Sequence, residues 1–265
     1  MTLTDLARRV LLSPGIEAKT RPVPGRLTDA SPAPPVRVSE PARAAALRFR
    51  YKTNGPKLPR GDALREKARR GVAHHVLANH ELQAAEVMAA VLLAFPHAPP
   101  AFRAGLGEVL RDELRHTRMH LARAAACGVR FGQYTVNGHV WRSAGRFRDE
   151  LDYLAVLPLV FEARNLDESV ELAAMFEAAG DARGAGVLRR IGADEVGHVA
   201  FGLRWLRHFA GADADADAFA AWAGRLRAPT RPARAVGRVF LEAPRRAAGM
   251  DAAFLDRLKA AAGVA

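Results

Sequence analysis

The apolar positions of the chain repeat every three to four residues over four long segments, as expected for helices with one buried face. Prolines and glycines separate these segments, and Asp62 is placed to cap the first of them. Pro158 lies inside the third segment, where a kink is expected. The predicted helices cover residues 62–95, 101–126, 147–179 and 181–210. The sequence contains no sustained alternation of apolar and polar residues, so the predicted fold class is all-α.

The segments outside these helices differ in composition. Residues 1–60 are rich in proline and arginine and are expected to form a short helix, capped by Thr2 or Thr4, and then an extended arm. Residues 61–210, with their long irregular connection in the middle, predict an up-down four-helix bundle with one crossover. Residues 211–265 predict a C-terminal extension with short helices.

One short motif occurs twice, on the second and on the fourth predicted helix. Residues 112–116 read Asp-Glu-Leu-Arg-His, and residues 194–198 read Asp-Glu-Val-Gly-His. A glutamate and a histidine three residues apart lie on one helical face, about one turn apart, so each pair can bind one metal ion. One copy of this motif is weak evidence, whereas two copies on inner helix faces are a specific signal.

Each motif follows a helix that carries a glutamate within its apolar stripe. Glu81 and Glu162 precede the glutamates of the two motifs by 32 and 33 residues. A carboxylate buried in an apolar stripe costs free energy unless a cation or a metal ion compensates it. Glu86 and Asp167, five residues further on, lie about 140° round the helix and are expected on another face.

Two helices with one glutamate each and two with Glu-x-x-His each are the ligand pattern of di-iron and di-manganese carboxylate proteins. The predicted metal ligands are Glu81, Glu113, His116, Glu162, Glu195 and His198. Carboxylate oxygen with imidazole nitrogen suits iron or manganese, and zinc less specifically. Two iron ions are therefore the predicted cofactor, with manganese as the alternative. The competing interpretation, surface acids beside two hydrogen-bonded histidines, conflicts with the inner-face positions.

Further polar residues are expected around the ligands. Asp112 and Asp194 precede the motif glutamates, and each is expected to accept the second N–H of the histidine from the other motif. Solvation of both aspartates is the alternative. His120 lies one turn beyond His116, and its counterpart in the repeat is Gly202. This difference either leaves room for dioxygen or a substrate, or marks a hydrogen-bonded core histidine and a close helix contact.

Three stretches of the chain resemble the DUF455 family of ferritin-like proteins. They are Leu157-Pro-Leu-Val-Phe-Glu-Ala-Arg-Asn-Leu-Asp167, Asp194-Glu-Val-Gly-His-Val-Ala-Phe-Gly-Leu-Arg-Trp205 and Phe240-Leu-Glu-Ala-Pro-Arg-Arg-Ala-Ala-Gly-Met250. The resemblance extends over roughly residues 64–258 and implies a ferritin-like bundle with a metal site. It implies no reaction, and no catalytic residue beyond the ligands is assigned.

The resemblance also implies fixed roles for Arg164 and Asn165, which follow Glu162 closely. Arg164 is expected to pair with Asp167 as a structural ion pair, or to bind an anionic group of a substrate. His80 departs from the family pattern, and neither His80 nor His139 receives a role.

Composition narrows the choice of partners. The net charge of +12 comes almost entirely from arginine, but the arginines are spread along the chain, which favours a solvated surface over a nucleic-acid site.

The longest apolar run, residues 87–95, is far shorter than the roughly 20 residues of a membrane span. With no secretory signal pattern at the N-terminus, the expected compartment is the cytoplasm. The single cysteine, Cys127, excludes an internal disulfide.

The predicted function is that of a di-iron oxidoreductase, which activates dioxygen to hydroxylate or oxidise an unidentified small-molecule substrate. An external electron donor is an expected partner. Iron oxidation and storage, or peroxide disposal, is one alternative, and hydroxylation of tRNA is another. A scaffold with a vestigial site is disfavoured because all six ligands are present. A monomer or homodimer is expected, since both arms would hinder packing into a storage shell.

Overall fold

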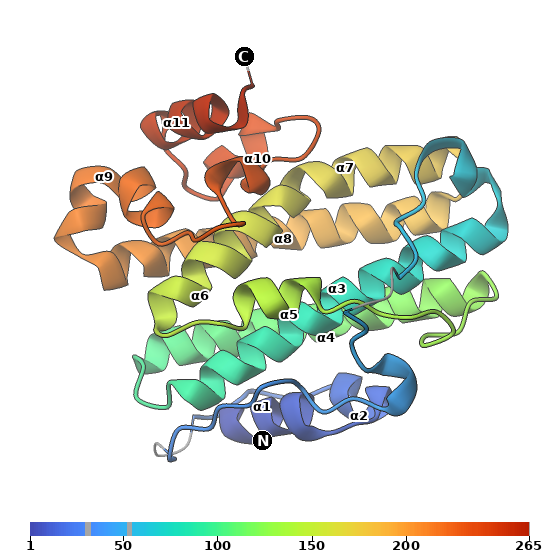
Figure 1. The fold of residues 1–265 in the computed structure, drawn as a ribbon, viewed down its shortest axis with the longest axis horizontal. Coiled ribbons are helices and arrows are strands. Elements are labelled where there is room, and N and C mark those ends of the chain that lie inside the picture. Colours follow the sequence, from blue (N-terminus) through green and yellow to red (C-terminus); the bar gives the residue numbers. More distant parts are fainter. Residues whose placement is uncertain (30–32, 52–54, 265) are drawn as a thin grey trace. The chain divides into compact units, whose positions relative to one another are not determined.

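Every regular element in residues 1–29, 33–51 and 55–264, which the computed structural model describes, is a helix (Figure 1). Extended segments within these residues meet only at two isolated bridges, Thr2 with Thr28 and Phe49 with Val136. The predicted all-α class is therefore confirmed. Residues 30–32 and 52–54 of the predicted arm, and residue 265 of the predicted extension, lie outside the described part.

The chain divides into two units, Met1–Gly145 and Arg146–Ala265. The predicted arm thus belongs to the first unit and the predicted C-terminal extension to the second. Among the described residues, no helix is both long enough and apolar enough to cross a membrane.

The first unit is built on two long antiparallel helices, α3 (Lys67–Ala94) and α4 (Pro100–Ala126) (Figure 1). The short helix predicted at the start of the N-terminal arm exists as α1 (Leu3–Leu12). Thr2 is its N-cap, and the Thr2 side chain accepts from the backbone N–H of Asp5. α1 packs on α3, and α2 (Ile16–Thr20) packs on α4. Because α1 and α4 both cover α3, that helix is buried on nearly all sides.

Two local predictions in this unit are wrong. Asp62 does not cap the long helix, because Gly61 adopts a positive φ of 57° and residues 61–65 form the 3-10 turn η2 (Gly61–Arg65). α3 begins only at Lys67. The connection between the second and third predicted helices was expected to be irregular, but it contains α5 (His139–Ala144). The backbone N–H of Trp141 in α5 donates to Gln83 Oε1 on α3 at 3.1 Å.

A buried ion cluster holds the N-terminal arm against α3. Glu86 is fully buried and pairs with Lys19 Nζ at 2.9 Å and with Arg43 Nη2 at 2.7 Å. Burial lowers the pKa of the Lys19 amine, although Glu86 opposes this shift. Arg43 also donates to Asn79 Oδ1 at 3.0 Å. The arm is therefore a packed strap at these positions, and Glu86 compensates two buried cations.

The second unit contains a comparable helical pair that is interrupted on one side. Its first helix consists of α6 (Glu150–Val156), the π-helical turn η3 (Leu157–Glu162) and α7 (Ala163–Ala178). α8 (Ala182–Ala210) runs antiparallel to α7 (Figure 1), and Asp181 is its N-cap. A kink was expected at Pro158, and the structure has a widened, π-helical turn there. Proline lacks an N–H, and its ring clashes with the carbonyl four residues earlier.

Gly202 on α8 lies directly against this turn. A Cβ at position 202 would approach the Cβ of Pro158 to 2.5 Å, much closer than carbon atoms pack. Of the two interpretations offered for Gly202, the close helix contact therefore applies.

The C-terminal segments pack on the same unit. They are α9 (Ala212–Ala223), the 3-10 turn η4 (Pro232–Ala235), α10 (Glu242–Ala247) and α11 (Ala252–Ala262). Trp222, Phe254 and Leu159 share one hydrophobic core, and the Trp222 indole donates to the carbonyl of Ala155 at 2.9 Å. The described part of the predicted extension, residues 211–264, therefore contributes to the core of the second unit.

Candidate metal centre

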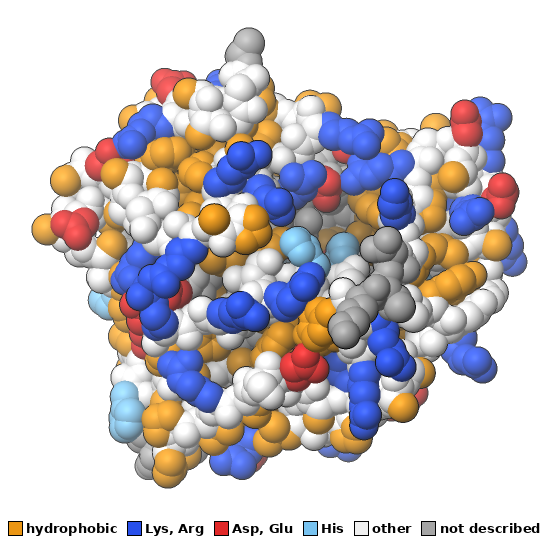
Figure 2. All heavy atoms as spheres, in the orientation of Figure 1, with side chains coloured by type: hydrophobic (Ala, Val, Ile, Leu, Met, Phe, Trp, Pro, Cys, Tyr) orange, Lys and Arg blue, Asp and Glu red, His pale blue; other side chains and the backbone are white. Residues whose placement is uncertain are grey.

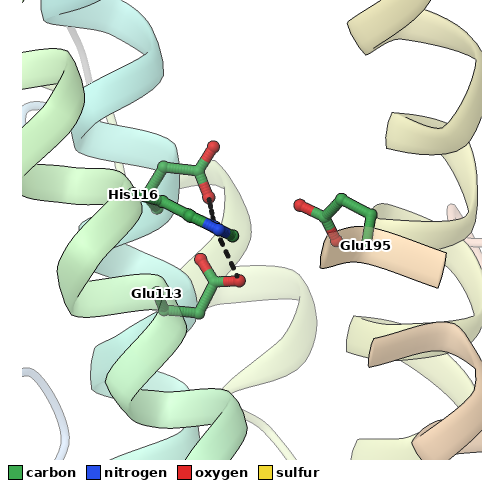
Figure 3. Close-up of side chains that lie close together, drawn as sticks. Glu113, His116 and Glu195 are labelled. Atoms are coloured by element: carbon green, nitrogen blue, oxygen red, sulfur yellow. Dashed lines mark ion pairs between the residues drawn. The ribbon is translucent and has the colours of Figure 1, made fainter. Parts of the chain in front are cut away.

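In the first unit, α3 and α4 bring three predicted ligands together. Glu113 and His116 project from the same side of α4, where His116 Nδ1 lies 3.6 Å from Glu113 Oε1 (Figure 3). Glu81 on α3 places Oε2 4.0 Å from the same nitrogen. Each residue offers one ligand atom within 4.8 Å of those of the other two. This group is called triad 1.

In the second unit, η3 and α8 bring together the other three. Glu195, labelled on α8 in Figure 3, places Oε2 3.4 Å from His198 Nδ1. Glu162 is the last residue of the π-helical turn. Its ligand atom lies within 4.8 Å of those of Glu195 and His198. This group is called triad 2, and both triads match the spacing predicted from the repeated motif.

Burial makes both triads costly without a cation. All six side chains are buried, and Glu113, His116 and Glu195 have no exposed surface. Each triad places two carboxylates within 4.8 Å of each other, and like charges at that distance in the interior repel strongly. A divalent cation shared by the carboxylates relieves the repulsion, and the oxygen and nitrogen donors suit iron or manganese. The residues present therefore fit a bound metal ion.

Comparison with known proteins identifies the family. The model of the family described as "Protein of unknown function (DUF455)" matches residues 6–256, which is most of the chain. The chain belongs to the DUF455 family. No curated protein and no solved structure matches it. The resemblance seen in the motifs around Glu162 and Glu195 is thereby confirmed at the level of the family.

In this DUF455 protein, Glu195 has a further partner. Asn165, one turn after Glu162, donates from Nδ2 to Glu195 Oε1 at 3.3 Å. The contact orients the carboxylate and leaves Oε2 on the side of His198. The resemblance implied a fixed role for Asn165 without naming it, and this contact suits the orientation of a candidate ligand.

His120 contacts triad 1 from one turn along α4. Its Nε2 lies 3.8 Å from Glu81 Oε1, and its Nδ1 lies 2.9 Å from Nδ1 of His74. Burial lowers the pKa of His120 well below its ordinary value, and the neighbouring histidines, His74 first, act in the same direction. His74 was not predicted. Its spacing of seven residues from Glu81 places it on the same face of α3, but in an apolar helix this also fits a core histidine.

Asp112 and Asp194 form ion pairs on their own helices. Asp112 Oδ1 accepts from Arg115 at 2.6 Å, and Asp194 Oδ2 accepts from Arg190 at 3.3 Å. The predicted crossed pairing with the motif histidines joins residues of different units and stays a prediction.

Arg164 forms a structural ion pair, but with a different partner from the one expected. It donates to Glu168 at 2.9 Å and to the carbonyl of Val236 at 3.0 Å. Asp167 is instead bound by Arg245 at 2.6 Å. Pairing four residues apart on a helix is geometrically easy, and Arg245 already occupies Asp167.

The two histidines without a predicted role differ in burial. His80 is half-buried on α3, and His139 is exposed at the start of α5.

Proposed function

We propose that triads 1 and 2 join in one di-metal centre of a ferritin-like four-helix bundle. In this proposal the protein is a non-haem di-iron oxidoreductase that uses dioxygen to hydroxylate or oxidise a small substrate. One observation carries it: in each unit, a buried Glu-x-x-His helix lies against a helix that presents a buried glutamate within 4.8 Å. Two such halves supply the four carboxylates and two histidines of a di-iron carboxylate site.

The chain's own residues would hold the metal ions and keep the centre dry. Nδ1 of His116 and of His198 is the nitrogen nearest the carboxylates in each triad. Asn165 keeps Glu195 turned towards His198 through its other oxygen. The candidate ligands on α3 and α8 lie on buried faces of these helices, and in this proposal those faces would keep water from the metal ions and so limit side reactions.

When bound, two iron ions would pass electrons from the reductant and the substrate to dioxygen, which carboxylates and histidines cannot do. Hydroxylation of a C–H bond by dioxygen consumes two electrons from the substrate and two from outside. It forms one C–OH and one water. An external reductant is therefore a required partner in this proposal.

Dioxygen consumption tests the proposal. Metal-free protein is loaded anaerobically with two Fe²⁺ per chain and mixed with oxygenated buffer in the presence of a reductant such as ascorbate. We expect oxygen uptake at least about tenfold faster than for the same Fe²⁺ in buffer, and loss of this acceleration in Glu113→Ala. Glu108→Ala is the matched control, because Glu108 is exposed on the same helix and pairs only with Arg111 in the described residues. Uptake no faster than in buffer would contradict the proposal.

Repeated additions of Fe²⁺ separate this function from its alternatives. Iron that stays at about two ions per chain supports an oxidoreductase, whereas continued soluble accumulation of ferric iron would indicate storage.

The tRNA alternative depends on the positive charge of the surface. Arginine and lysine side chains are spread over the face of the molecule in Figure 2, among hydrophobic and acidic ones. Salt-dependent binding of tRNA would instead favour a nucleic-acid substrate.

A further inference from the structure

Glu81 is contacted by two histidines of α4, and each faces a different carboxylate oxygen. His116 Nδ1 lies 4.0 Å from Oε2, on the side of triad 1, and His120 Nε2 lies 3.8 Å from Oε1. Both histidines are buried, and Glu81 retains only 6% exposure. The nearest oxygen of Glu81 therefore differs between the two histidines: it is Oε2 for His116, a member of triad 1, and Oε1 for His120.

The contact between His120 and His74 limits where the ring protons lie. Their Nδ1 atoms are 2.9 Å apart, so one nitrogen must donate and the other must accept. If His120 accepts at Nδ1, its own proton lies on Nε2 and faces Glu81. If His120 donates instead, a nitrogen lone pair faces the carboxylate oxygen, which is repulsive. The first arrangement satisfies both contacts.

We infer that His120 is a positioning residue for Glu81, with His74 fixing its tautomer. His74 donates Nδ1–H to His120, and His120 donates Nε2–H to Oε1 of Glu81, which leaves Oε2 for the metal ion. The separation of 3.8 Å is too long for a hydrogen bond, by roughly 0.6 Å, so the inference requires this contact to shorten when the metal ion binds, as contacts in unloaded sites commonly do. This inference rests on the proposed metal centre.

The second unit shows the same device built from another residue. In the repeat, Gly202 on α8 corresponds to His120 on α4. Because Pro158 packs directly against Gly202, no side chain fits at this position. Asn165 supplies the N–H donor instead, to Oε1 of Glu195. Each triad therefore has one of its carboxylates oriented by a side-chain donor from outside the triad, although the donors are unrelated in the repeat. Metal ligands are generally oriented in this way by groups behind them.

Manganese affinity tests the inference in four proteins: wild type, His120→Leu, His120→Gln and His75→Leu. We expect His120→Leu to raise the Kd of one of two bound Mn²⁺ ions by about 10- to 100-fold. His120→Gln, which retains an N–H near the position of Nε2, should restore the Kd to within about threefold of wild type. His75→Leu is the control, because His75 is also buried but contacts Gly132 and Phe131, and its Kd should match wild type.

The outcomes separate this inference from the proposed function. Equal Mn²⁺ affinity in wild type and His120→Leu, or no recovery in His120→Gln, would overturn the role of His120 and leave the metal centre standing. A wild type that binds no Mn²⁺ would overturn both.

Nitrogen-15 NMR of the metal-free wild type gives a second test that needs no variant to fold. The expected tautomers are Nε2–H for His120 and Nδ1–H for His74. Nδ1–H on His120 would overturn the inference.

Discussion

Arg245 binds both carboxylate oxygens of Asp167, at 2.6 Å from Nη1 to Oδ1 and at 2.8 Å from Nη2 to Oδ2. Neither side chain is appreciably exposed. Backbone N–H groups of Gly237 and Leu241 donate to the same carboxylate. Glu86 in the first unit has an equivalent place, because it also follows a candidate ligand by five residues and binds a buried arginine, Arg43. In each unit the helix that carries a candidate ligand is thus tied to a terminal segment.

Replacing Arg245 should destabilise the protein strongly. Arg245→Leu leaves the buried carboxylate of Asp167 without its cation, which typically costs about 3–5 kcal/mol. Chemical denaturation monitored by circular dichroism measures the loss. Arg246→Leu is the matched control, since its pair with Glu242 is exposed and should contribute less than about 1 kcal/mol. Equal losses in the two variants would contradict the anchoring role of Asp167.

Gly202 should tolerate no side chain without a loss of stability. Gly202→Ala brings a Cβ to 2.5 Å from Pro158, so α8 or the π-helical turn must shift, at a cost of about 1–3 kcal/mol. Gly186→Ala on the same helix meets nothing within 4 Å and should instead stabilise the protein by about 0.5–1 kcal/mol. Thermal unfolding of both variants checks the prediction. A stabilising Gly202→Ala would show that the contact with Pro158 is not tight.

His75 should make stability depend on pH. Burial lowers its pKa from 6.5 to about 4, so the folded protein keeps the ring neutral where the unfolded chain protonates it. The free energy of unfolding should therefore fall as the pH drops from about 6.5 to about 4, and His75 should add nothing further below that. In His75→Phe this part of the pH dependence should disappear, even though the variant loses the hydrogen bond from Gly132 at every pH. Identical slopes in the two proteins would rule out a buried neutral His75.

The helices and the triads were predictable because both follow from local spacing. Apolar periodicity located α4 and α8 within a few residues, and the Glu-x-x-His motifs placed ligands on one helical face. The start of α3 was mispredicted because Asp62 was expected to be the N-cap of the long helix. Gly61 adopts a positive φ, and residues 61–65 form a separate 3-10 turn instead. Local preference and tertiary structure disagreed at that point.

Partners that lie far apart in the sequence were not predictable. Asp167 and Glu86 were expected to point away from the ligand face, but the residues around them do not indicate their partners. Asp167 binds Arg245, 78 residues away, and Glu86 binds Arg43, 43 residues away. The same limit applies to His74, whose contact with His120 spans 46 residues. A buried histidine in an apolar helix gives no sign of its partner until the helices pack.

The central claim is that triads 1 and 2 form one di-metal centre, and the electron paramagnetic resonance spectrum of the Mn²⁺-loaded protein tests it most directly. The account predicts about two Mn²⁺ per chain and the multiline signal of two spin-coupled ions, lost in both His116→Ala and His198→Ala. Two uncoupled Mn²⁺ signals, or less than about 0.2 bound metal ions per chain, would contradict it.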